Sequence, residues 1–96
     1  MIGVQGRDWF VKTFALTSSD VALTIAKAVR SFVIQNRSDA DVQIRRETAD
    51  TDYWTMKAGS SLSVDAYLGG ESSTNTTVGY ARLSSGTGTL EVLCIY

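Results

Sequence analysis

The charged side chains of this 96-residue chain, which could take part in acid–base chemistry or bind ions, are ten carboxylates and nine Lys and Arg residues. The chain also has one cysteine and no histidine. Without histidine, the chain lacks the usual general base, the commonest metal ligand and the central member of a Ser-His-Asp or Cys-His arrangement. The single cysteine, Cys94, excludes an internal disulfide and a zinc site built from several thiolates. This inventory predicts a protein that is not an enzyme and that uses no cofactor or metal.

Four aspartates form two pairs with D-x-D spacing, Asp39 with Asp41 and Asp50 with Asp52. Such pairs can bind Ca²⁺, but this ion takes six to eight oxygens, and the glycine and distant glutamate of an EF-hand loop are missing. We therefore expect ordinary solvated turns. The Gly-Thr-Gly sequence at 86–88 lacks a third glycine and precedes a strand, so it does not match a phosphate-binding loop.

The charge pattern argues against nucleic acid as a partner. The net charge is −1, and acidic residues are interspersed among the arginines, whereas nucleic-acid binding needs a clustered basic face. We expect the arginines to form ion pairs in solvent or between subunits. No apolar segment approaches the ~20 residues that cross a bilayer, and the first residues do not form a secretory signal, so we expect no membrane contact.

Alternating apolar and polar residues define the elements that position these side chains. Between Arg30 and Leu68, four short runs alternate with period two and are separated by turn residues, a pattern typical of antiparallel strands joined by hairpins. The run 57–60 reads as a hairpin turn, with Gly59 free to adopt a positive φ. Similar runs at 8–16, 78–83 and 89–96 bring the total to seven or eight strands. The fold class is therefore all-β, a single antiparallel β-sandwich over residues 8–96 preceded by a flexible arm at 1–7.

Residues 21–29 are the ambiguous segment. Alanines favour a helix there, whereas Val21, Leu23 and Ile25 alternate as in a strand. Because a nine-residue helix with several β-branched residues is weak, we predict a strand at 21–26 and a turn at 27–29. The polar segments 36–41 and 69–77 are predicted to be loops.

Both terminal strands carry bulky residues on both faces. In the last strand, Leu90, Val92, Cys94 and Tyr96 share one face and Leu93 and Ile95 share the other, which predicts a strand held between two neighbours. Cys94 is expected to be an inert core thiol. Core packing is the default for Trp9, and exposure would make it a contact residue.

Three segments, RSFVIQNRSDADVQIR at 30–45, YWTMKAGSSLSVD at 53–65 and GTGTLEVLCIY at 86–96, resemble small virion proteins of tailed bacteriophages. The resemblance covers roughly residues 20–96 and involves strand and turn residues, so no functional site is transferred by it. It implies a jelly-roll-like sandwich, synthesised in the host cytoplasm and located in the virion. Its expected role is capsid decoration (cement), with copies of itself and major capsid or other virion proteins as partners.

Apolar and aromatic side chains are the expected contact residues of such an oligomer. We assign this role to Trp9, Phe10, Tyr53, Trp54, Leu93, Ile95 and Tyr96. Of Tyr53 and Trp54, we expect one in the core and the other at the surface. The alternative function is a tail- or fibre-associated module that binds carbohydrate or a receptor through aromatic platforms, for which the candidates are Tyr53, Trp54, Tyr67 and Tyr80.

Overall fold

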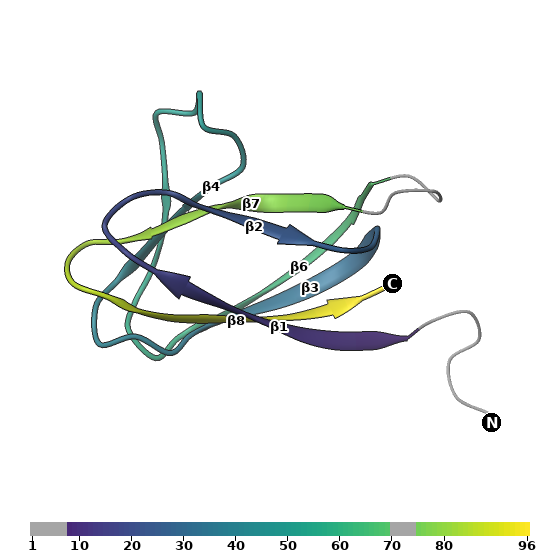
Figure 1. The fold of residues 1–96 in the computed structure, drawn as a ribbon, viewed down its shortest axis with the longest axis horizontal. Helices are drawn as coiled ribbons and strands as arrows, with labels where there is room; N and C mark the ends of the chain where they lie inside the picture. Colours follow the sequence, from purple (N-terminus) through teal and green to yellow (C-terminus); the bar gives the residue numbers. More distant parts are fainter. Residues whose placement is uncertain (1–7, 70–74) are drawn as a thin grey trace.

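Eight β-strands form the fold of the computed structural model, which describes residues 8–69 and 75–96; no helix occurs in these ranges. The strands lie in two layers (Figure 1). Their bounds are β1 Trp9–Leu16, β2 Val21–Ile25, β3 Val29–Asn36, β4 Val42–Arg45, β5 Trp54–Met56, β6 Ser61–Leu68, β7 Thr76–Leu83 and β8 Gly88–Ile95. The predicted all-β fold is confirmed. The predicted arm at 1–7 lies outside the described residues.

The two four-stranded sheets have the strand order of a jelly roll. The first sheet runs β1-β8-β3-β6 and the second β2-β7-β4-β5, and every strand pair is antiparallel. Two sheets built in this alternating manner from eight strands are the jelly-roll arrangement, which the resemblance to small virion proteins implied. The last strand, β8, lies between β1 and β3, as its two apolar faces indicated.

The connections between strands differ from the prediction. Within 30–68, only β4 and β5 are paired as a hairpin, whereas β3 to β4 and β5 to β6 cross from one sheet to the other. The turn at 57–60 is formed, with the Ser60 amide donating to the Lys57 carbonyl at 3.0 Å and Gly59 at φ 79°. It joins strands of different sheets and so is not a hairpin turn. Tight turns have the same local chemistry in both cases, because a turn fixes the chain's reversal and not its pairing partner.

The ambiguous segment 21–29 is a strand followed by a short bend, as predicted, although β2 ends at Ile25 and Val29 already belongs to β3. Strand β7 begins at Thr76 and β8 at Gly88, so Thr76, Thr77 and Gly88 are strand residues, not the loop and turn residues that the sequence predicted. Thr76 is buried and Thr77 bonds to Thr24 of β2 through their hydroxyls at 2.8 Å. Pairing with β2 therefore extends β7 into the polar segment.

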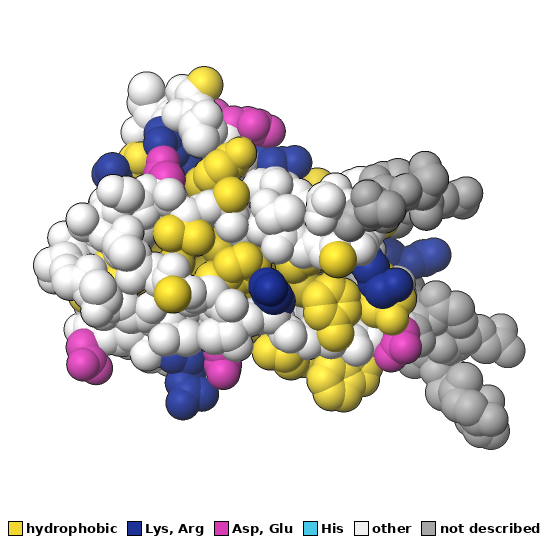
Figure 2. Space-filling view, in the orientation of Figure 1, with side chains coloured by type: hydrophobic (Ala, Val, Ile, Leu, Met, Phe, Trp, Pro, Cys, Tyr) yellow, Lys and Arg dark blue, Asp and Glu magenta, His cyan; other side chains and the backbone are white. Residues whose placement is uncertain are grey.

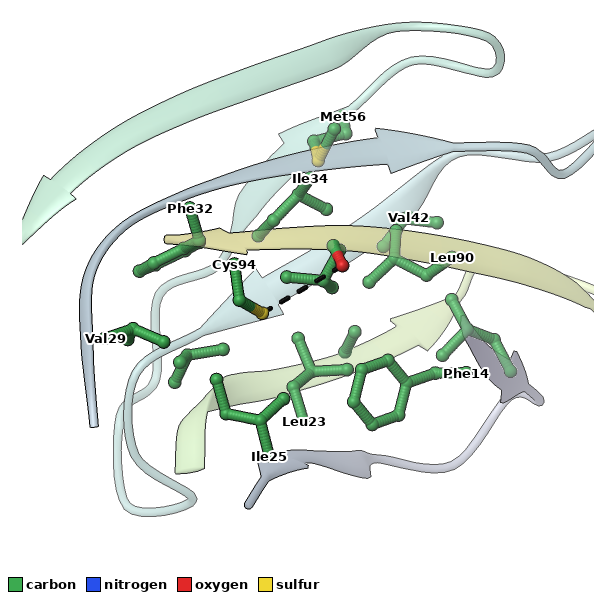
Figure 3. Packing of buried hydrophobic residues seen from close by; sticks show 14 of the residues in the cluster. Phe14, Leu23, Ile25, Val29, Phe32, Ile34, Val42, Met56, Leu90 and Cys94 are labelled. Atoms are coloured by element: carbon green, nitrogen blue, oxygen red, sulfur yellow. Dashed lines mark hydrogen bonds between the residues drawn. The ribbon is translucent and has the colours of Figure 1, made fainter. Parts of the chain in front are cut away.

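The hydrophobic core fills the space between the two sheets (Figure 3). Leu90, Val92 and Cys94 of β8 are all buried, and they lie among residues from both sheets. Burial raises the pKa of the Cys94 thiol to about 11, and its Sγ contacts the Val92 carbonyl oxygen at 3.9 Å. Cys94 is thus a protonated core residue at neutral pH, in agreement with its expected inert role.

One buried amide fixes the loops at one end of the sandwich. Asn36 is fully buried, and its Nδ2 donates to the carbonyl oxygens of Ala40, Met56 and Lys57 at 3.1–3.2 Å. Its Oδ1 accepts from the Ser38 amide at 2.9 Å. The predicted bonding of the 36–41 loop to its own backbone is confirmed, and the same side chain also holds the end of β5, which is distant in sequence.

Candidate interaction surfaces

The outer face of the first sheet carries a group of apolar side chains, two of them exposed and three half-buried. In the strand register, Val11 and Val33 flank Leu93, while Trp9 lies beside Ile95. Residues directly opposite each other in an antiparallel pair share one face. We call this group the outer patch, and its members are Trp9, Val11, Val33, Leu93 and Ile95.

The outer patch faces away from the core. The alternate residues of the same strands, such as Phe14 and Val92, are buried between the sheets. Trp9 is 63% exposed and Val11 52% exposed. The default expectation that Trp9 packs in the core is therefore wrong, and β1 is an edge strand. Figure 2 shows hydrophobic side chains gathered over the beginning of β1 and the end of β8, at the lower right.

Two further predicted contact residues, Phe10 and Tyr96, lie at the same end of the β1–β8 pair, but Phe10 is opposite the buried Cys94 and so faces the core side of the sheet. Their rings contact each other with centroids 5.6 Å apart, and the Lys27 ammonium lies 4.5 Å from the Tyr96 ring centroid. Asp8 and Tyr96 exchange two backbone hydrogen bonds of 3.0 and 2.9 Å. Burial, reinforced by the Asp8 carboxylate, raises the pKa of the Tyr96 hydroxyl. These contacts close the end of the β1–β8 pair next to Trp9.

Tyr53 lies on the opposite side of the molecule, against the second sheet. The guanidinium carbons of Arg45 and Arg82 lie 4.8 and 4.2 Å from its ring centroid, which are cation–π distances. Arg82 also donates through Nε to Gln43 at 2.9 Å. The ring is half-buried by these contacts, so Tyr53 is a packed surface residue.

Arg45 is held in place by an ion pair that reaches from β4 to the residue before β2. Its Nη2 donates to Oδ2 of Asp20, both side chains are largely buried, and its Nη1 donates to the Asp50 carbonyl at 2.7 Å. The hydrogen bond to Asp20 raises the pKa of Arg45. Arg45 therefore forms a largely buried ion pair within the chain. The ion pairs of Arg37 with Glu91 and of Arg46 with Glu47 also lie within the chain, but at its surface.

Trp54 is 61% exposed and sits at the mouth of a groove. Since Tyr53 is half-buried at the surface, neither of these neighbouring aromatics is in the core, and the expected division between core and surface is wrong. The groove, of about 330 Å³, lies between the two sheets beside β5 and β6 and is lined mainly by apolar side chains.

Tyr80, another candidate platform, is half-buried on β7, opposite Arg45.

The predicted contact residues therefore separate into different places. Trp9, Leu93 and Ile95 come together on the outer face, Phe10 and Tyr96 contact each other on the core side of the same sheet, and Tyr53 and Trp54 lie elsewhere. The prediction missed Val11 and Val33 as members of the patch. Alternation placed Val11 on the same face as Trp9, so this signal was present, but Val33 required knowledge that β3 pairs with β8.

The acidic pairs are used in turns. Asp41 accepts a hydrogen bond from the Ala58 amide at 3.3 Å, and Asp50 accepts one from the Glu47 amide at 3.1 Å. Within residues 8–69 and 75–96, no three carboxylate or cysteine side chains come close enough to hold a metal ion. Nor does the described part of the chain contain a helix with the length and hydrophobicity needed to cross a membrane.

Comparison with protein-family models, with curated proteins and with solved structures finds no match to this chain.

Proposed function

We propose that this protein is a structural component of a bacteriophage virion, a capsid decoration (cement) protein that stabilises the particle through symmetric contacts among many copies. The observation that carries the proposal is the outer patch, where exposed Trp9 and Val11 adjoin Leu93 and Ile95. A contiguous apolar area at the surface, with an aromatic anchor, is typical of a protein–protein contact. The resemblance of residues 20–96 to small virion proteins supplies the biological setting.

The described sheet edges carry features that oppose strand-to-strand association, which favours the face of the sheet as the contact. On β1, Lys12 lies between Phe10 and Phe14 on the inward-facing side of the strand, and it is exposed. The β6 edge is interrupted by an extra residue between Asp65 and Leu68, and the β5 edge has only three residues. Charged, bulged and short edges are the usual means of preventing edge pairing.

The proposed partners are other copies of this chain and the major capsid protein or another virion protein. A decoration protein acts by bridging, so it needs a contact surface and no catalytic centre. The outer patch would meet an apolar area on the neighbour, and burial of a Trp side chain there contributes roughly 2 kcal/mol or more per contact. Repetition over a symmetric shell multiplies a modest contact into a stable assembly.

The alternative proposal, a carbohydrate- or receptor-binding module of the tail or fibre, is favoured by one observation. Trp54 presents an exposed ring beside a groove, and exposed aromatic rings can stack on a flat ligand. Tyr53 already packs against Arg45 and Arg82. A glycan array would separate the two functions, since loss of glycan binding in Trp54→Ala, with Trp9→Ser unaffected, would favour the module.

The decisive experiment is mass spectrometry of purified particles of the virus that encodes this chain. We expect the protein in many copies per particle, and we expect particles stripped of it to lose heat resistance. Adding purified protein back should restore that resistance, whereas protein carrying Trp9→Ser should restore little. Absence of the chain from intact particles would contradict the proposal.

A further inference from the structure

The groove beside β5 and β6 is an open side of the hydrophobic core. Its floor includes Phe32 and Ile34 of the first sheet and Leu23 and Val78 of the second. All four are at most 6% exposed, so they close the bottom of the groove, and an occupant would contact mainly the less buried side chains of its walls. Its volume of about 330 Å³ is within the range of ligand sites that are lined mainly by hydrophobic residues.

The walls of the groove are apolar and only partly covered. On one side, β6 contributes Leu62, Val64, Ala66 and Leu68, which are half-buried. On the other side stands Trp54, which is 61% exposed. Covering such side chains with hydrocarbon stabilises a complex by roughly 25 cal/mol per Å² of apolar surface removed from water.

The charged side chains that line the groove in the described part of the chain are both positive. The charged residues that line it, among those the structure describes, are Arg45 and Arg46. Arg45 is committed to Asp20 and to the Tyr53 ring. Arg46 is half-exposed, and its ion pair with the adjacent Glu47 at 3.3 Å is also exposed and therefore weak. The Arg46 guanidinium is thus the group that can meet an anion.

The β6 edge disfavours a peptide strand as the occupant. Strand addition requires a regular row of backbone donors and acceptors. The register of β6 against β3 shifts by one residue, since Ser31 pairs with Asp65 and Val29 pairs with Leu68. A hydrocarbon chain makes no such demand, because apolar burial is not directional.

We propose that this groove binds a single-chain fatty-acid carboxylate, with the hydrocarbon chain between β6 and Trp54 and the carboxylate at Arg46. The site is separate from the outer patch, which lies on the other face of the first sheet. No bond is made or broken, so the site is one of binding only.

Dodecanoate, used below its micellar concentration, is the probe. The chain has two tryptophans, Trp9 and Trp54, so the variant Trp9→Phe leaves Trp54 as the reporter at the groove. We expect saturable binding with a blue shift of Trp54 emission as the hydrocarbon covers the ring. Dodecanol and dodecyltrimethylammonium are the neutral and cationic comparisons, and both should bind more weakly than dodecanoate. An emission spectrum that does not change with dodecanoate would overturn the proposal.

Two variants in the Trp9→Phe background locate the site. Arg46→Gln should weaken dodecanoate binding roughly fivefold and leave dodecanol unchanged, as expected for one partly exposed ion pair. Arg37→Gln is the matched control, because Arg37 is also an exposed arginine with an acidic partner but does not line the groove. Ala66→Phe should fill the groove and abolish binding of both ligands, with thermal unfolding confirming that the variant folds.

The Arg46→Gln result stands even if Ala66→Phe does not fold. Equal affinity of Arg46→Gln and Arg37→Gln for dodecanoate, or undiminished binding by folded Ala66→Phe, would overturn the proposal.

Discussion

Trp9 lies directly opposite Ile95 in the antiparallel pair of β1 and β8, with both side chains on the outer face of the first sheet. Across β8, Ser31 lies on the other side of Ile95, and one row further Val11, Leu93 and Val33 are aligned. The two ends of the chain and its third strand therefore build one apolar surface. Asp8 and Tyr96 fix this arrangement by exchanging two backbone hydrogen bonds.

Lys12 is expected to keep the β1 edge from pairing with other chains. It is exposed in the middle of an edge strand, with its Nζ 6.0 Å from the Phe14 ring centroid. Lys12→Ile should make the protein aggregate, because the edge loses its one charged residue within β1. Light scattering during incubation at a fixed concentration measures this. Lys57→Ile, in an exposed turn, is the control and should remain soluble; equal scattering by both variants would argue against edge protection.

Removal of residues 1–7 should leave the fold intact and weaken assembly. Strand β1 begins at Trp9, and its backbone hydrogen bonds to β8 and Tyr96 use residues from Asp8 onward. We therefore expect a melting temperature close to that of the full chain. We also expect weaker self-association, because the predicted arm precedes Trp9 of the outer patch in the sequence. Calorimetry and sedimentation measure the two quantities. A fall in thermal stability equal to the loss of assembly would instead place the arm in the core of the fold.

Asn36 should be one of the most sensitive positions for stability. In Asn36→Asp, the carboxylate cannot donate to the three carbonyl oxygens that Nδ2 now serves, and a charge is placed in a fully buried site. We expect a loss of roughly 3 kcal/mol in the free energy of unfolding, measured by urea denaturation. Gln35→Glu makes the same amide-to-acid change at an exposed neighbour; it adds a like charge opposite Glu91 of β8 and should cost about 1 kcal/mol or less. Similar losses in both variants would refute the role of the buried amide.

Cys94 should make stability fall in alkaline solution. The reference thiol pKa is 9.0 and that of the folded protein is about 11, so between these values the folded state holds more protons than the unfolded state. Stability therefore decreases as pH rises above 9 and the decrease levels off above about 11. Cys94→Ala should lower the free energy of unfolding by about 1 kcal/mol at pH 8, through the lost packing, and this difference should shrink at higher pH. Parallel pH curves for the two proteins would contradict the account.

Much of the strand pattern could be predicted because alternation is a local property. Phe32 and Ile34, or Leu90 and Val92, show their common face without knowledge of any partner strand, and all of them are buried. The buried thiol of Cys94 followed from its apolar neighbours in the same way. In segment 21–29, β-branched residues correctly outweighed the alanines.

Pairing between distant strands could not be predicted in this way. The turn at 57–60 looks the same whether it joins paired strands or crosses between sheets, so β5 and β6 were expected to form a hairpin. The outer patch depends on contacts between Trp9 and Ile95, which lie at opposite ends of the sequence. The groove depends on where β5 and β6 end up as edges of two different sheets.

Sedimentation velocity over a range of protein concentrations tests most directly whether the outer patch is an assembly contact. The comparison is between the full chain and the double variant Trp9→Ser with Val11→Ser, with Thr13→Ala on the same strand face as the control. We predict concentration-dependent association of the full chain and of the control, and a monomer for the double variant with little change in its melting temperature. A full chain that stays monomeric at every concentration, or a double variant that associates as strongly as the control, would contradict the account.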